Sequence, residues 1–505
     1  MVGVSRSRAC ADCKRRRVKC DLTSPRCQRC TKAGIICRGI RNQPTLWVHR
    51  TPTKPNVSAL SVIQSQQQTN WLSLLQRMRY QINSKETYDV PTFRSQAFSI
   101  AVSIYFPQGR YTTSEEDHSS TPSSWLKAVC NTEDPSEALD HSLVAFVAIQ
   151  IRLSGEVGVS YDEAIELYNH ALSKVIHVLD CPCIGNNDES LAAIVILSTC
   201  ELFLFHASTS WNAHAQGVSE ILRHRVVPEA NTSSWNDLCR RLCVICVIQA
   251  LSQKKPLNLE PNLWRKHIGP WAAPESFGAL LDMAIDIPAV MAEAHTLALS
   301  NEKDREKLLR YVNLLIEKFH VLDDWRALVH RNIAARNQTP LFWSVPSRAS
   351  NPADDGYPDR LFPFALIFSS VEGASPWILC SSIMLDILET ILLLRGKLGS
   401  SDASSSLGET LDSYKEQGSP NQADADHIAR MLCQSVEYCY RSENGTFGPQ
   451  ITCNAQATLL GYFAGRGMKR ELEWCRAIKY MKGPGTSFGI DLMQFKPPPE
   501  LSALV

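Results

Sequence analysis

The sequence predicts a small, cysteine-clamped N-terminal module followed by a large all-α body. Three observations lead to this prediction. Six cysteines crowd into residues 10–37, a basic N-terminal block precedes an acidic remainder, and the rest of the 505-residue chain is a series of segments with helical periodicity. The chain is 44% hydrophobic and 20% charged, which is enough apolar material for a large core and excludes a mainly disordered protein.

The formal net charge of +1 is the sum of two oppositely charged parts. Residues 1–54 carry 14 lysines and arginines but only two acids, Asp12 and Asp21, which gives a net charge of +12. The other 451 residues carry 38 basic and 49 acidic residues, a net charge of −11. A basic segment attached to an acidic body indicates a polyanion-binding module tethered to a different kind of domain.

The cysteines and the apolar stretches predict a reducing, intracellular compartment. The residues after Met1 contain no apolar core of a secretory signal. The most apolar stretch, Leu191 to Phe205, is interrupted by Glu201 and is shorter than a membrane span. We therefore expect no membrane partner, and we expect that the 18 cysteines do not form a disulfide framework.

The N-terminal cysteines form a C-x2-C-x6-C unit that is repeated after 17 residues. Thiolates at C-x2-C spacing reach one metal, and tetrahedral sulfur coordination favours zinc. Two four-coordinate sites need eight ligand positions, so the cysteines hold two Zn²⁺ ions only if two thiolates bridge, and the symmetry favours Cys10 and Cys27. A single zinc bound by the two C-x2-C pairs is the alternative, and it leaves Cys20 and Cys37 without a role. The six candidate ligands are Cys10, Cys13, Cys20, Cys27, Cys30 and Cys37.

Basic residues are distributed unequally over the two halves of this repeat. The second half has only Lys32 between its last two cysteines, whereas the first half has Lys14, Arg15, Arg16, Arg17 and Lys19. Arginine suits bidentate contact with guanine in the major groove, and both basic residue types bind phosphates. We therefore predict that the first half reads bases and that the second half contacts phosphates through Arg29 and Lys32. By itself, such a basic run also fits a solvated face or a nuclear-import signal.

Residues 9–39 closely resemble the DNA-binding module of the fungal Zn2Cys6, or binuclear zinc cluster, transcription factors. The spacing C-x2-C-x6-C-x6-C-x2-C-x6-C and Pro25, two residues before Cys27, match the family pattern. The resemblance implies that Cys10 and Cys27 bridge two Zn²⁺ ions and that the first helix reads a CGG-like triplet. We assign Arg16 and Arg17 to bases, and Lys14, Arg15 and Lys19 to the DNA backbone. The family commonly has lysine at the position of Arg17, so the exact triplet is not defined by the resemblance.

Residues 41–90 are predicted to be a proline-containing linker that ends in a short helix. Pro44, Pro52 and Pro55 keep its first part extended. Apolar residues from Trp71 to Ile82 have helical spacing, but residues 64–70 contain none, so an unbroken heptad seam fails. A helix docked on the body and a dimerising coiled coil, which the family often has here, are the two interpretations. A homodimer is therefore a candidate partner state.

Residues 91–505 are predicted to form the all-α body. Alternating strand patterns bounded by tight-turn residues are nearly absent from it. Residues 399–426 are low in complexity, carry six acids against Lys415, and are predicted to be a disordered insertion. Helical periodicity is found at 138–154, 162–180, 188–207, 212–226, 235–251, 278–300, 302–335, 376–397, 425–441, 452–466 and 469–481.

A second, weaker resemblance lies within the body. Residues 200–225 resemble the fungal-specific transcription factor domain that accompanies these zinc clusters, through Glu201, Trp211, His214 and Gly217. Residues 471–481 show another likeness to that domain. Trp211 and His214, three residues apart, equally fit ordinary helix packing. The resemblance implies a regulatory domain and identifies no effector.

The sequence contains no G-x-S-x-G, H-E-x-x-H or Walker A motif, so we expect no enzyme. We expect a nuclear, zinc-dependent transcription factor of the RNA polymerase II type that binds double-stranded DNA and contacts co-regulators or the transcription machinery. Analogy with the family favours a pathway-specific regulator, for example of a secondary-metabolite gene cluster. Regulation of nutrient use, or of stress or drug resistance genes, is one alternative, and a zinc-cluster protein-interaction module without DNA readout is another.

Overall fold

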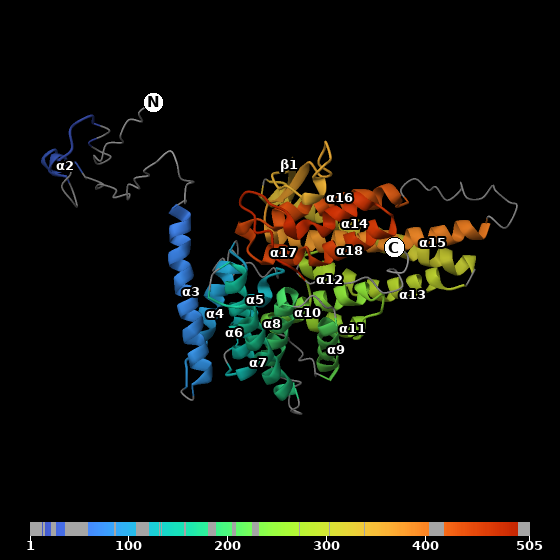
Figure 1. Ribbon diagram of the computed structural model, residues 1–505, viewed down its shortest axis with the longest axis horizontal. Coiled ribbons are helices and arrows are strands. Elements are labelled where there is room, and N and C mark those ends of the chain that lie inside the picture. Colours follow the sequence, from blue (N-terminus) through green and yellow to red (C-terminus); the bar gives the residue numbers. More distant parts are fainter. Residues whose placement is uncertain are drawn as a thin grey trace. The chain divides into compact units, whose positions relative to one another are not determined.

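The computed structural model divides the chain into two compact units, residues 1–64 and residues 65–505. We describe each unit by itself, and Figure 1 shows the chain coloured along its sequence. The residues that the structure describes are 13, 16–21, 27–35, 59–84, 87–107, 121–130, 132, 134–155, 158–179, 188–204, 209–224, 232–271, 273–301, 304–337, 339–402 and 419–492.

The larger unit is largely helical, as the sequence predicts (Figure 1). Its first helix is α3 (Ala59–Asn83), of which the residues from 65 onward belong to this unit. The next helices are α4 (Val90–Ile104), α5 (Ser124–Cys130), α6 (Glu137–Leu153), α7 (Tyr161–Leu179), α8 (Asp188–Leu204), α9 (Thr209–His224) and α10 (Ser233–Ser252). They continue with α11 (Pro261–Ile268), α12 (Phe277–Ala284), α13 (Ile287–Leu299), α14 (Arg305–Asn337), α15 (Val371–Asp402), α16 (Gln422–Cys439), α17 (Phe447–Ile451), α18 (Cys453–Gly465) and α19 (Lys469–Arg476).

Two kinds of helix build the N-terminal half of this unit. α6 and α8 are buried on all sides: the residues of α6 from Ala138 to Ile151 are buried, and so is every residue of α8 from Glu189 to Leu204. α7 packs against both and is amphipathic, with Ala164, Tyr168, Ala171 and Val175 on its buried face. A helix that is apolar all round belongs in the centre of a core, and a helix with one apolar stripe belongs at its edge. The periodicity of the sequence therefore determines the layering as well as the helices.

α15 is the central helix of the C-terminal half. It packs against α13, α14, α16 and α18. Within the described part of the chain, its segment Val371–Gly399 is the one helix that is long and apolar enough to cross a membrane. However, 83% of that window is buried inside the protein, as in the core helix of a helical domain. α15 is longer than α8, which contains most of the apolar stretch from Leu191 to Phe205, and both helices are largely buried.

The body is not entirely α-helical, which corrects the prediction. The strands β1 (Phe342–Pro346) and β2 (Phe364–Phe368) form a two-stranded antiparallel sheet in which Phe342 lies opposite Phe368. Both segments are rich in aromatic and aliphatic residues that favour strands. The sequence gives little sign of this pair, because a long connection rather than a two-residue turn joins the strands.

Several predicted boundaries also differ from the structure. Pro288 lies in the first turn of a new helix, so the predicted 278–300 helix is divided into α12 and α13. α15 runs to Asp402 and α16 begins at Gln422, so both ends of the predicted 399–426 insertion are helical. Asn421 forms a capping box with Asp424 at the start of α16, a signal hidden by the polar composition. Residues 403–418 lie outside the described residues.

The body begins before residue 91. Leu75 and Met78 of α3 are buried in the same core as the helices that follow, and the larger unit starts at residue 65. The interpretation of a helix docked on the body therefore has structural support. α4, α5, α11 and α17 were not predicted, because short helices give too few turns for a periodic pattern.

Gly445 joins the C-terminal half to the end of α4, and its replacement tests this junction. Its φ is +58°, and a Cβ atom there would lie 2.3 Å from the carbonyl oxygen of Ile104 and 2.5 Å from that of Tyr105. We expect Gly445→Ala to lower the free energy of unfolding by about 2–5 kcal/mol, from the left-handed backbone and the clash together. Urea denaturation followed by circular dichroism measures this change. Gly396→Ala, on an open face of α15, is the control and should be neutral or slightly stabilising.

Candidate metal centre and nucleic-acid interface

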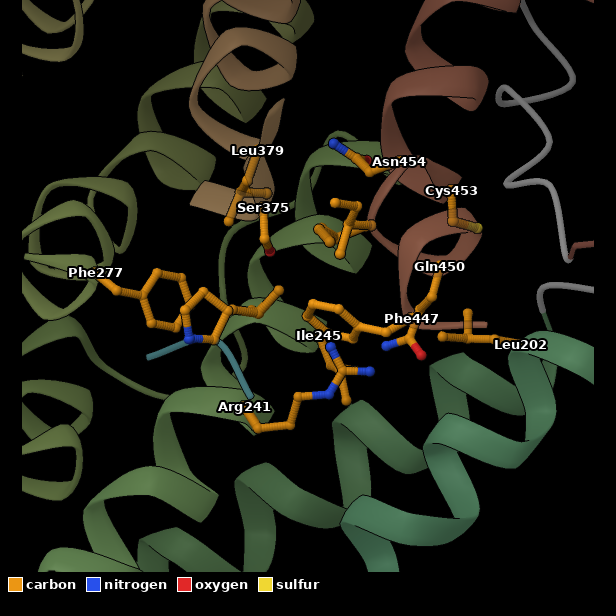
Figure 2. A pocket seen from close by; sticks show the side chains of 14 residues that line it. Leu202, Arg241, Ile245, Phe277, Ser375, Leu379, Phe447, Gln450, Cys453 and Asn454 are labelled. Atoms are coloured by element: carbon orange, nitrogen blue, oxygen red, sulfur yellow. The ribbon is translucent and has the colours of Figure 1, made fainter. Parts of the chain in front are cut away.

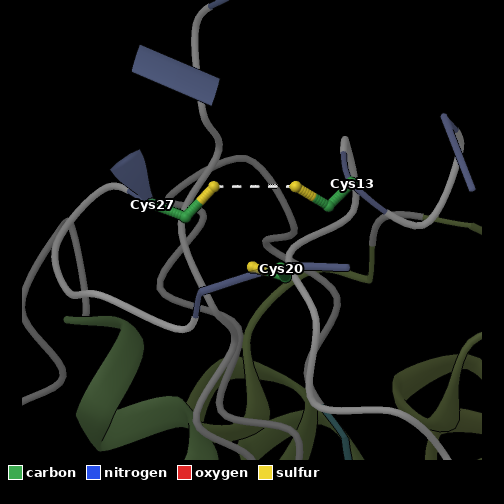
Figure 3. Close-up of side chains that lie close together, drawn as sticks. All are labelled: Cys13, Cys20 and Cys27. Atoms are coloured by element: carbon green, nitrogen blue, oxygen red, sulfur yellow. Dashed lines mark hydrogen bonds between the residues drawn. The ribbon is translucent and has the colours of Figure 1, made fainter. Parts of the chain in front are cut away.

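The described part of the smaller unit is organised around cysteine side chains. Cys13, Cys27 and Cys30 are fully buried, and Cys20 packs against them. The Sγ atom of Cys13 lies 3.7 Å from that of Cys27 and 3.8 Å from that of Cys30. The sulfur atoms of Cys13, Cys20 and Cys27 all lie within 4.8 Å of one another (Figure 3). The fold thus brings together thiols from both halves of the repeat.

These distances fit a zinc centre. Thiolates at about 2.3 Å from a tetrahedral zinc lie about 3.8 Å from one another. The Sγ distance of 3.7 Å between Cys13 and Cys27 fits two ligands of one ion, and the 3.8 Å between Cys13 and Cys30 would also fit a single ion bound by the two C-x2-C pairs. A disulfide would require sulfur atoms about 2 Å apart. Because thiolates at such short range repel each other, a bound cation is the arrangement that stabilises them.

The sequence repeat is also a repeat of backbone geometry. The N–H of Val18 donates to the carbonyl of Cys13 over 3.1 Å, and the N–H of Ile35 donates to the carbonyl of Cys30 over 3.0 Å. In each half the residue before the donor has a positive φ, 55° at Arg17 and 63° at Gly34. This is the Schellman pattern of a helix C-terminus. The described residues of each half therefore end a turn in the same way, next to a buried cysteine.

Asp21 connects the two halves. Its Oδ1 accepts a hydrogen bond from the N–H of Gln28 over 3.1 Å, and its Oδ2 accepts one from the N–H of Arg29 over 2.7 Å. These donors open α2 (Gln28–Lys32), where a carboxylate satisfies the free N–H groups. The sequence-based reasoning missed this role. The available signal was an acid directly after Cys20 within a strongly basic segment.

The structure describes five of the seven predicted DNA-binding residues, and their side chains are exposed: Arg16, Arg17, Lys19, Arg29 and Lys32. Among the described residues, no carboxylate forms an ion pair with any of them. Arg17 was expected on the first helix, but it lies just beyond the helix end in the left-handed conformation. Of the two bridging candidates, Cys27 is among the described residues. Lys14, Arg15, Cys10 and Cys37 lie outside the described residues.

The residues of the second resemblance lie on neighbouring helices of the larger unit. Glu201, on α8, is buried and accepts a hydrogen bond from the hydroxyl of Tyr168. Gly217, on α9, is exposed. The side chains of Trp211 and His214 lie outside the described residues. The described members of the pattern thus show a packing role for Glu201 and no common site.

Residues 8–46 match the family model of the fungal Zn(2)-Cys(6) binuclear cluster domain. This match indicates a fungal zinc-cluster transcription factor that binds zinc and DNA, in agreement with the resemblance of residues 9–39. The match ends before the larger unit begins, and it does not extend to the resemblance of residues 200–225. No curated protein and no solved structure matches the chain.

Proposed function

We propose that this chain is a nuclear, zinc-dependent and sequence-specific regulator of transcription by RNA polymerase II. The observation that carries the proposal is the cluster of Cys13, Cys20 and Cys27, with exposed arginines beside it, in a segment that matches the binuclear cluster family. Bound zinc supplies folding free energy and compensates the thiolate charge, and it takes no part in any reaction. The chain is assigned no catalytic role.

The zinc ligands are proposed to form two centres that share two thiolates. Cys13 and Cys20 belong to the first centre, Cys30 and Cys37 belong to the second, and Cys10 and Cys27 bridge them. The position of Cys20 near Cys13 and Cys27 supports this assignment. In the alternative with one zinc, Cys20 is not a ligand, and the 3.8 Å between the Sγ atoms of Cys13 and Cys30 is the observation that favours this alternative.

DNA contacts are proposed to divide between the two helix ends. Arg16 and Arg17 lie exposed at the end of the first helix, where guanidinium groups can reach guanine edges. Arg29 and Lys32 lie on the exposed face of α2 and are assigned to phosphates. Lys14, Arg15 and Lys19 are assigned to phosphates as well. The body, with a net charge of opposite sign, disfavours non-specific contact with DNA.

Replacing Arg17 by glycine tests the reading of bases. The DNA site is first selected from a random pool with the full-length chain, and affinities for that site and for a scrambled site are then measured at one salt concentration. We expect Arg17→Gly to weaken binding to the selected site by about 10- to 100-fold, and to the scrambled site far less. Glycine accepts the φ of 55° that Arg17 adopts, so the helix end keeps its shape.

Lys32→Ala is the matched control for a phosphate contact. It should weaken binding to both sites about equally and reduce the slope of affinity against salt by about one. An equal loss on both sites in Arg17→Gly would refute the base contact. Failure of the full-length chain to enrich any motif would refute sequence-specific binding and favour a protein-interaction module.

Which genes the chain regulates is proposed from analogy with the family alone. We propose a pathway-specific regulator, for example of a secondary-metabolite gene cluster, with nutrient use or stress and drug resistance as the alternative. Transcripts that change when the gene is deleted decide between these roles. A homodimer and contacts with co-regulators stay predictions, and sedimentation of the full-length chain tests the first of them.

A further inference from the structure

A pocket lies within the larger unit, where its N-terminal and C-terminal helices meet (Figure 2). It is partly open to solvent, and the space inside it is small, about 60 Å³. α8, α10, α12, α15, α17 and α18 all contribute to its wall. Most of the lining is apolar and includes Leu202, Ile245, Phe277, Leu379 and Phe447.

One arginine contributes its side chain to this apolar wall. Arg241 extends from α10 toward the pocket (Figure 2). Within the described residues its single hydrogen bond is a long one, 3.4 Å from Nη2 to Oγ1 of Thr199, and its buried Nε has no partner. The guanidinium lies 5.6 Å from the ring centre of Trp125. Its neighbour Arg240 differs, because it forms an ion pair with Asp237 over 3.1 Å.

The groups around Arg241 do not neutralise its charge. Burial raises the pKa of the Cys453 thiol to about 12, and burial also raises the pKa of the Tyr105 phenol, so both are neutral near pH 7. Within the described part of the chain, no carboxylate pairs with Arg241. Burial lowers the pKa of Arg241 itself, because the apolar surroundings disfavour its cation. A bound anion would remove this unfavourable burial of an unpaired charge.

Two amide side chains complete the lining. Gln450 Oε1 and Asn454 Nδ2 are buried and have no hydrogen-bond partner within the described residues. Figure 2 shows Arg241 and Asn454 on opposite sides of the pocket, with Ile245 and Phe447 between them. The pocket therefore has a cationic end, an apolar middle and a second polar end. Apolar walls with a few convergent polar groups are typical of a ligand site.

We propose that this pocket binds a small molecule that has a carboxylate and an apolar body, with the carboxylate held by Arg241. The cation supplies a charge-assisted hydrogen bond, and the aliphatic and aromatic walls bury the body. A compact inorganic anion would leave those walls without a contact. Because the wall includes both α10 and α18, the ligand would connect the two halves of the larger unit. The inference goes beyond DNA binding and does not depend on it.

The proposal is tested with matched pairs of charged and neutral probes on the full-length chain. The pairs are octanoate with octanamide, and 4-phenylbutyrate with 4-phenylbutyramide, and affinities are obtained from calorimetric titration. We expect one carboxylate or both to bind about tenfold more tightly than the matched amide, the usual scale for a charge-assisted contact. Arg241→Gln should remove this preference for the charged probe while leaving the affinity for the amide nearly unchanged.

Two further variants test whether the effect is specific to Arg241 and to the pocket. Arg223→Gln removes an exposed arginine that is paired with Glu220 on α9, outside the pocket, and should keep the preference. Val244→Phe narrows the pocket and should weaken both members of a pair. Equal binding of carboxylate and amide, no binding of any probe, or an unchanged preference in Arg241→Gln would overturn the proposal. If Arg241→Gln does not fold, retention of full carboxylate affinity in Val244→Phe would overturn it.

Discussion

Cys20→Ser in the full-length chain is expected to lower affinity for the selected DNA site by at least about 100-fold, because the module loses its folded shape. Among the described residues of the smaller unit, the buried core consists of cysteines alone, with Cys20 packed against it. Metal binding to such a module provides about 10–16 kcal/mol, which is the same free energy that folds it. Removal of one ligand therefore affects the whole module. Fluorescence anisotropy and elemental analysis measure the DNA affinity and the zinc content.

Two controls distinguish the loss of a zinc ligand from the loss of a cysteine elsewhere in the chain. Cys130→Ser, at a half-buried position on α5, should keep both the DNA affinity and the zinc content. A chelator should reproduce the loss seen in Cys20→Ser, and added zinc should restore binding to the original chain. We expect two zinc ions per chain. One zinc per chain, with full DNA binding by Cys20→Ser, would instead support the site formed by the two C-x2-C pairs.

Arg94→Met is expected to lower the free energy of unfolding of the body by about 3–5 kcal/mol, since it leaves a buried carboxylate without its cation. Arg94 Nε lies 3.0 Å from Asp140 Oδ1, and both side chains are fully buried. The guanidinium also donates to Thr132 Oγ1 over 2.8 Å and to the carbonyl of Asp134 over 2.9 Å. Tyr88 donates to the other oxygen of Asp140 over 2.5 Å. Urea denaturation measures the loss.

An exposed ion pair provides the control for this buried one. Lys174 Nζ lies 2.8 Å from Glu137 Oε2, and these side chains are 34% and 76% exposed. Lys174→Met should cost less than about 1 kcal/mol, because solvent screens the pair. The double replacement Arg94→Met with Asp140→Leu should recover much of the loss, as it leaves no buried charge. Equal effects of Arg94→Met and Lys174→Met would contradict the expectation.

The effect of Arg94→Met should also depend on pH. Burial raises the pKa of Asp140, and Arg94 acts in the opposite direction. Without the arginine the folded-state pKa rises further, whereas the unfolded value does not change. A carboxyl group whose pKa is higher in the folded than in the unfolded state does not destabilise the fold at a pH below its unfolded-state pKa. Its destabilising effect grows as the pH rises toward and through the folded-state pKa. The loss should therefore be smaller at pH 5 than at pH 7.

The zinc module and most of the helices could be predicted because their signals are local. The C-x2-C-x6-C repeat places thiols at fixed short separations along the chain, and the structure brings Cys13, Cys20 and Cys27 together as that spacing requires. Helical periodicity works in the same way, since a buried face is visible within a few turns. The sheet was missed because its pairing depends on segments separated by a long connection.

Contacts between distant segments depend on the tertiary structure. Asp21 and Arg94 were not predicted as structural residues, because their partners are defined by packing rather than by spacing. The same holds for Arg241: its place in a helical segment is visible in the sequence, but the sequence does not show that no described carboxylate pairs with it. The chain by itself determines which short segments can bind metal or form helices. Only packing determines which polar groups are buried and paired, because desolvation depends on everything that surrounds a group.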